Sequence, residues 1–174
     1  MNPHTHLNLI IRPERAADIE AIARVTEAAF RAAPHSTHTE SFIVAALRRA
    51  GQLAISLVAE DGDRLVGHVA LSPVAISSGA AGWYGLGPIS VTPDLQGSGI
   101  GSALLRAALA ELPRIGGLGC VVLGEPGYYG RFGFAAHPGL LLPGVPAPYF
   151  QALSLGGPLP DGTVRYHAAF DATE

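Results

Sequence analysis

The chain has 174 residues, of which 48% are hydrophobic, so it can bury one sizeable core and we expect a single domain over residues 1–174. Its 14 acidic and 11 basic residues leave a formal net charge of −3, and every basic residue is arginine. This balance argues against nucleic acid as a partner, and the absence of lysine excludes P-loop and Schiff-base chemistry, which both need a lysine amine.

No uninterrupted apolar stretch approaches membrane-spanning length, and the polar start of the chain does not have the pattern of a secretory signal. We therefore expect a cytoplasmic protein with no membrane partner. No metal is expected, because no metal-ligand spacing is found among His4, His6, His35, His38, His137 and His167.

The first half of the chain predicts two helices and a strand hairpin. A β-rich run, Leu7–Arg12, ends at Pro13 and predicts a first strand. Apolar residues at spacings of three and four predict a helix over 19–30, and a similar stripe predicts a second helix from about Thr39 to Arg49. Two strand-like runs, Ala54–Ala59 and Arg64–Ser72, flank the turn Glu60–Asp63 and predict a hairpin.

The second half predicts a distorted strand, a helix and further strands. Trp83–Val91 contains Gly85, Gly87 and Pro88, which weaken regular pairing and indicate a bulge or bend. The glycine-rich turn Gln96–Gly101 leads into a helix over 102–112, and Cys120–Leu123 predicts a buried strand with a core cysteine. The last two runs, Tyr149–Leu155 and Thr163–Phe170, are expected to pair around the turn at 158–162.

The order strand, glycine loop, helix predicts an anion site. The first amides of a helix have no intrahelical partner, and the helix dipole favours negative charge beside them. The spacing does not fit the dinucleotide fingerprint, because its third glycine would fall on Ser102 or Leu104. What remains is a pyrophosphate cradle made chiefly of backbone amides.

The segment Val91–Gly101 resembles the acetyl-coenzyme A signature Q/R-x-x-G-x-G/A of the GNAT superfamily, with Gln96, Gly99 and Gly101 at its defining positions. The resemblance, which extends over about residues 9 to 135, implies an α/β (α+β) fold: a mixed, mostly antiparallel twisted sheet with a splayed strand pair, flanked by helices. It implies acetyl-CoA as cosubstrate and an N-acetyltransferase activity. The cofactor-binding residues that it implies are Ile89, Ser90, Val91, Gln96, Gly97, Ser98, Gly99, Ile100, Gly101, Ser102 and Phe132.

The segment Tyr129–Phe134 is similar to the family's Y-x-K/R-x-G-F motif, whose leading tyrosine is commonly the general acid. This resemblance assigns Tyr129 the role of protonating the departing thiolate. A phenol with a pKa near 10 suits that task. Tyr128 would pack or line the acceptor pocket.

The general base is not marked by the sequence, since Trp83–Val91 contains no carboxylate or histidine. The candidates are Glu40, His68, Glu125 and water. Glu40 is chosen, because the first two helices of this fold usually frame the acceptor pocket, although Thr37–Glu40 also reads as a capping box. His68 is read first as a hydrogen-bonded core histidine, and Glu125 lies beside a turn.

The predicted reaction is direct transfer of the acetyl group from acetyl-CoA to a primary amine within a ternary complex. The acceptor, a small molecule or a peptide, is not specified by the sequence, and a homodimer is left open. Two alternatives remain: a module that binds an acyl-CoA without turnover, and a structural subunit that dimerises through its C-terminal strands.

Overall fold

The computed structural model describes residues 7–174, so His4, His6 and the polar start of the chain lie outside the described residues. Four α-helices are α1 (Ile19–Phe30), α2 (Glu40–Arg49), α3 (Ile100–Glu111) and α4 (Pro126–Tyr129). The strands are β1 (Leu9–Pro13), β2 (Ile55–Asp61), β3 (Arg64–Pro73), β4 (Ala75–Ile76), β5 (Trp83–Val91), β6 (Gly119–Leu123), β7 (Leu140–Leu141), β8 (Phe150–Ser154) and β9 (Gly162–Arg165).

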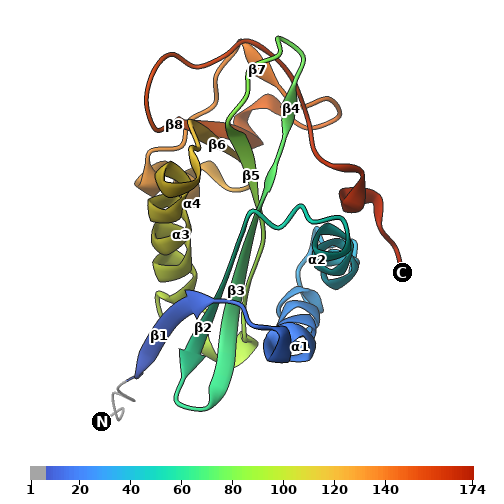
Figure 1. Ribbon diagram of the computed structural model, residues 1–174, viewed down its shortest axis with the longest axis vertical. Coiled ribbons are helices and arrows are strands. Elements are labelled where there is room, and N and C mark those ends of the chain that lie inside the picture. The colour runs from blue at the N-terminus through green and yellow to red at the C-terminus, as the bar shows by residue number, and fades with distance from the viewer. Residues whose placement is uncertain (1–6) are drawn as a thin grey trace.

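A six-stranded sheet in the order β1-β2-β3-β5-β6-β8 forms the centre of the molecule. Its pairs are antiparallel except β5 with β6, which is parallel, so the expected mixed and mostly antiparallel sheet is confirmed. A small three-stranded sheet, β4-β9-β7, lies at one end of it (Figure 1).

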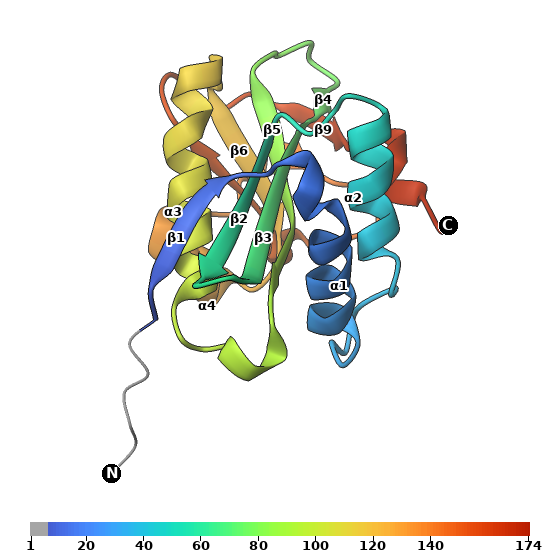
Figure 2. The ribbon, with the colours of Figure 1, turned by 60° about the horizontal axis from the view of Figure 1, so that its bottom comes forward.

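Helices cover both faces of the large sheet. Successive strand residues point to opposite faces, and on β2 Leu57 packs with Leu104 of α3 while Val58 packs with Ile22 of α1 and Val44 of α2. Helix α3 therefore covers one face, and α1 and α2 cover the other (Figures 1 and 2). Cys120 is fully buried in the α3-side core, as the sequence predicts.

The parallel pair β5–β6 is short and then separates. β6 residues pair with β5 only at Trp83, Tyr84 and Gly85. Beyond Gly85 the remaining residues of β5, 86–91, have no partner on β6, and only Leu86 and residues 89–91 pair with β3 on the other side. The splayed strand pair is therefore present, and it leaves one edge of β5 open.

Most predicted elements are confirmed, and the C-terminal pairing is wrong. The helix over 19–30 and the hairpin of β2 with β3 are found where expected, and the register between β3 and β5 shifts opposite Gly87 and Pro88. The two C-terminal runs do not pair with each other: β8 pairs with β6, while β9 pairs with β4 and β7. Between residues 7 and 174, no helix is long and apolar enough to cross a membrane.

Candidate functional site

The glycine loop joins the end of β5 to the start of α3. Gly97 and Gly99 have φ values of +78° and +92°, a region that glycine adopts without steric cost. The Gln96 side chain donates from Nε2 to the Val91 carbonyl oxygen at 3.1 Å, and Ser98 Oγ donates to the Leu95 carbonyl. Gln96 and Ser98 therefore fix the shape of the loop through their side chains.

The backbone amides of the loop divide into two groups. Those of Gln96 and Ser98 donate to the carbonyls of Pro93 and Leu95, at 3.4 and 3.3 Å. Those of Gly99, Ile100, Gly101 and Ser102 have no backbone acceptor within residues 7–174, because they are the cap and first turn of α3. The amides that remain for an anion are thus that of Gly97 and those at the cap and first turn of α3.

A hollow of about 430 Å³ lies over these amides, and it is lined by Val91, Leu95, Gln96, Gly97, Gly99, Gly101, Ser102, Tyr128 and Arg131. Tyr128 contributes its hydroxyl, which lies 3.2 Å from Ser102 Oγ. Arg131 is the one charged side chain among the lining residues that the structure describes, and its guanidinium lies 4.7 Å from the centre of the Tyr128 ring. Free amides and a cation make this hollow suited to a phosphate group.

Phe132, the last of the predicted cofactor-binding residues, packs against Tyr128 but does not line this hollow. Its ring is 5.4 Å from that of Tyr128, and the guanidinium of Arg106 lies 5.1 Å from its centre. Arg106 is one helical turn beyond Ser102 on α3. A second cation therefore lies on the α3–α4 surface next to the glycine loop.

The open edge of β5 presents Ile89 and Val91 but not Ser90. The amide of Thr92 donates to Val66 on β3 at 2.9 Å, and backbone groups alternate between the two edges of a strand. Ser90 is therefore bonded toward β3, opposite His68, while Ile89 and Val91 direct their polar backbone groups to the open edge. An extended ligand can pair with Ile89 and with the Val91 amide as an added strand would, since the Val91 carbonyl already accepts from Gln96.

Tyr129 lies in the α3-side core next to the open edge. Its ring packs at right angles to that of Tyr128, with centroids 5.0 Å apart, and lies so close to Gly124 that a Cβ there would be 2.3 Å from Cε2. Burial, with smaller contributions from Tyr128 and Cys120, raises the pKa of Tyr129 to about 12. Tyr129 therefore keeps its proton at neutral pH.

The base candidates lie in three different settings. Glu40 is the first residue of α2, and its Oε1 accepts from Ser36 Oγ at 2.7 Å. It lines a hollow of about 370 Å³ with residues of α1, separate from the glycine-loop hollow. The expected capping box is not formed, because Glu40 is at the first helical position and the Thr39 side chain caps no amide.

His68 is a core histidine, as the sequence favours. Its Nε2 lies 2.8 Å from Ser56 Oγ, and burial, followed by the charge of Arg48, lowers its pKa to about 3. Glu125 is exposed and precedes α4, and its carbonyl accepts from the amides of Tyr128 and Tyr129. Neither side chain lines the glycine-loop hollow.

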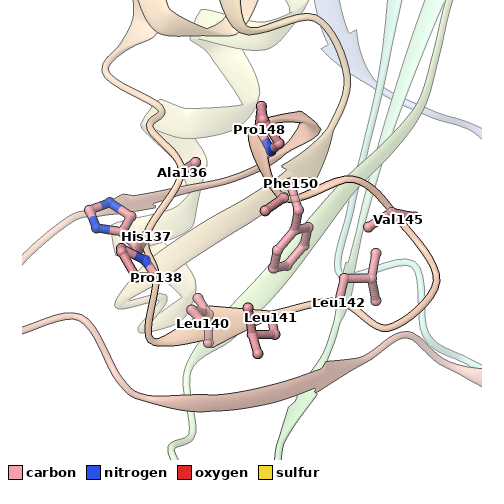
Figure 3. Close-up of a pocket in the computed structure, with 10 residues that line it drawn as sticks. Ala136, His137, Pro138, Leu140, Leu141, Leu142, Val145, Pro148 and Phe150 are labelled. Atoms are coloured by element: carbon pink, nitrogen blue, oxygen red, sulfur yellow. The ribbon is translucent and has the colours of Figure 1, made fainter.

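The Pro/Gly-rich segment after α4 encloses an apolar hollow of about 350 Å³ (Figure 3). The ring of Phe150 points into it, toward the segment that carries Leu140, Leu141 and Leu142. None of the predicted site residues lines it. Among residues 7–174, no group of three or more His, Cys, Asp or Glu side chains could hold a metal ion.

Sequence reasoning did not single out Arg131 as a site residue. Residues three apart on a helical turn share a face, so the spacing of Tyr128 and Arg131 could have placed both over the glycine loop. In a chain without lysine, an arginine at the x-R position of the tyrosine motif is also the natural source of positive charge. Tyr128 packs against Tyr129 and Phe132, and it also lines the glycine-loop hollow.

Comparisons with known proteins find relatives that match most of this chain. The family model for the acetyltransferase (GNAT) domain matches residues 10–136. The N-acetyltransferase YhbS of Escherichia coli is 32% identical over 171 residues, which cover 94% of this chain and 99% of YhbS.

Two solved structures are similar along nearly the whole chain. A GNAT family acetyltransferase from Brucella melitensis, solved in complex with acetyl-CoA, is 50% identical with a TM-score of 0.85, covering 95% of this chain and 100% of its own. The structure of E. coli YhbS in complex with CoA is 30% identical with a TM-score of 0.84, covering 100% of this chain and 98% of its own.

Proposed function

The chain belongs to the GNAT family of acetyltransferases, and from this premise we propose that it transfers the acetyl group of acetyl-CoA to a primary amine by direct attack. The observation that carries the proposal is the continuity of two features. The open edge of β5 runs directly into the free amides at the start of α3. Together they match a ligand with an extended amide-bearing arm and a pyrophosphate.

The proposed binding mode uses backbone groups for most contacts. The amides of Gly99–Ser102 would hold the pyrophosphate, with Arg131 adding charge from the turn that follows α4. The polar backbone groups of Ile89 and Val91 would pair with the amides of the pantetheine arm. The arm would then run from the glycine loop toward Gly85, where β5 and β6 separate.

The proposed chemistry needs one proton donor from the chain. Acetyl-CoA supplies a thioester carbon: the amine nitrogen bonds to it, the carbon–sulfur bond breaks, and the sulfur leaves as a thiolate. The Tyr129 hydroxyl would donate to that sulfur. Its raised pKa, about 12, keeps the hydroxyl protonated, so that Tyr129 can donate a hydrogen bond to the sulfur as negative charge develops there.

The amine must lose a proton as the new bond forms. We propose Glu40 as the acceptor of that proton, directly or through water, because its Oε1 is oriented by Ser36 and Oε2 is left to accept. The activity would belong to one N-acetyltransferase domain over residues 1–174 in the cytoplasm.

Calorimetric titration of the purified protein with acetyl-CoA and with CoA tests the proposal without knowledge of the acceptor. We expect stoichiometric binding of both. Tyr129→Phe should then bind acetyl-CoA normally and lose turnover of any amine that the protein acetylates, by roughly 100-fold. Tyr149→Phe, at an exposed tyrosine, is the matched control. Absence of binding by folded protein would refute the cosubstrate, and full activity of Tyr129→Phe would refute its role.

A further inference from the structure

A second tyrosine, Tyr166, lies against the point where β5 and β6 separate. It follows β9, and its ring lies on the backbone of Gly85: a Cβ at Gly85 would be 2.3 Å from Tyr166 Cε1. The ring is held by Val74, which also approaches Gly85, and by Phe170, whose centroid is 4.8 Å away. Only glycine at position 85 leaves room for this ring.

Tyr166 and Tyr129 approach the separation from opposite faces of the sheet. Tyr166 packs with Trp83 and Val121, while Tyr129 packs with Cys120 and Val122. Cys120 and Val121 are successive residues of β6, so their side chains point to opposite faces. Gly85 pairs with Val121 as the last β5 residue bonded to β6. Two glycines, Gly85 and Gly124, thus each admit one tyrosine ring, one on each face.

The Tyr166 hydroxyl is a neutral donor and acceptor. Burial raises its pKa far above the ordinary value, and the next causes are Cys120 and then Tyr129. The ring edge next to the hydroxyl lies nearest the opening between the strands, because Cε1 is 2.3 Å and Cδ1 3.0 Å from the Cβ position of Gly85. A phenol in this state can accept a hydrogen bond from an amine N–H and donate one in return.

A groove of about 500 Å³ gives access to Tyr166 from the face that carries α1 and α2. Its walls come from the β3–β4 corner, Pro73–Ala75, and from the segment that holds Arg165, His167 and Asp171. His167 Nδ1 accepts from the Ala169 amide at 3.0 Å, so its neutral form carries the proton on Nε2 and does not compete for an amine N–H. The acceptor can therefore reach Tyr166 without crossing the glycine-loop side.

We propose that Tyr166 is the positioning residue for the acceptor: its hydroxyl binds the incoming amine at the opening beside Gly85, on the face opposite Tyr129. The inference rests on the proposed acetyl transfer. The amine nitrogen would be held between the two phenols, with its lone pair toward the carbonyl carbon and one N–H on the Tyr166 oxygen. Tyr129 would serve the leaving sulfur, and Tyr166 the attacking nitrogen.

The test uses fluorine NMR of the protein made with 3-fluorotyrosine, whose five tyrosines give five signals assigned by single Tyr→Phe variants. Spectra are taken free, with CoA and with acetyl-CoA. We expect the Tyr128 signal to respond to both ligands and the Tyr166 signal to differ between CoA and acetyl-CoA, because only the acetyl group reaches the opening. Tyr149, which is exposed, should not respond.

Two variants extend the test to acetyl transfer. Tyr166→Phe should raise the KM for an amine that the wild type acetylates, by about tenfold, as expected for one lost hydrogen bond, with the KM for acetyl-CoA unchanged. Gly85→Ala keeps the phenol but displaces its ring, and should remove the acetyl-dependent change of the Tyr166 signal.

The outcomes separate the two proposals. If the Tyr129 signal distinguishes acetyl-CoA from CoA and the Tyr166 signal does not, the role of Tyr166 is overturned while the proposed function stands. If no tyrosine signal responds to either ligand, the proposed function fails and this inference fails with it.

Discussion

Replacing Gly99 with alanine should weaken CoA binding much more than it weakens the fold. Gly99 caps α3 with φ +92°, and its position has no atom within 4 Å of the place where a Cβ would stand. The substitution therefore causes no clash. It places a side chain in a left-handed conformation, which costs about 1 kcal/mol.

The effect on affinity comes from the position of the new methyl group. Gly99 lines the hollow above the free amides, so the methyl group would stand where a pyrophosphate must approach. Loss of one hydrogen bond to a charged group costs roughly 1.5–3 kcal/mol, which corresponds to about a 10- to 100-fold weaker Kd.

Gly116 provides the matched control. It has φ +80°, has no atom within 4 Å of its Cβ position, and follows the far end of α3, a helix of 12 residues that is about 18 Å long. Gly116→Ala should carry the same strain and lower Tm by a similar amount, about 2–4 °C. Its affinity for CoA should equal that of the wild type.

Calorimetry with CoA and thermal unfolding without ligand measure the two effects separately. Gly99→Ala should match Gly116→Ala in Tm and differ from it in Kd by at least tenfold. Equal Kd values for the two variants would refute the assignment of the pyrophosphate to the amides at the start of α3.

Two further predictions follow from the charges. Arg131→Gln should weaken CoA binding about tenfold, and this loss should become smaller at high salt. Arg114→Gln, beyond the other end of α3, is the control and should leave CoA binding unchanged. Equal losses for the two variants in calorimetry would contradict the role of Arg131. The lowered pKa of His68, about 3, means that below its unfolded value of 6.5 the unfolded state binds a proton that the folded state does not, so stability falls with falling pH. Denaturant titrations between pH 7 and 4 measure the free energy of unfolding, which in the wild type should fall by up to about 1.4 kcal/mol per pH unit more than in His68→Gln. Equal falls in the two proteins would show that His68 does not take up a proton on unfolding.

Features carried by local patterns could be predicted from the sequence. The stripe from Ile19 to Phe30 and the hairpin of β2 with β3 depend on neighbours three or four residues apart or on one tight turn, and both are found as expected. The bulge opposite Gly87 and Pro88 was also marked locally, because these residues disturb pairing wherever they stand in a strand.

Features that depend on distant partners were not predictable in the same way. β9 pairs with residues 75–76 and 140–141, and nothing in its own alternation identifies those partners. Tyr166 is a similar case, since its position on Gly85 joins residues 81 positions apart. Arg131 was not predicted as a site residue for another reason. It lies in the motif that was used to assign Tyr129, and its position in the glycine-loop hollow depends on how the segment after β6 packs against α3.

Glu40→Gln addresses the part of the proposed mechanism that the motifs do not mark. If Glu40 accepts the amine proton, Glu40→Gln should lower the turnover of the amine acceptor by roughly 100-fold. The affinity for acetyl-CoA should stay the same. Glu27→Gln is the control, because Glu27 lines the same hollow and makes no hydrogen bond to Ser36. Equal activity of Glu40→Gln and the wild type would mean that the proton passes to water. That result would remove the proposed catalytic role of the hollow beside α1. The proposed pyrophosphate site at the start of α3 would be unaffected, because Glu40 does not line it.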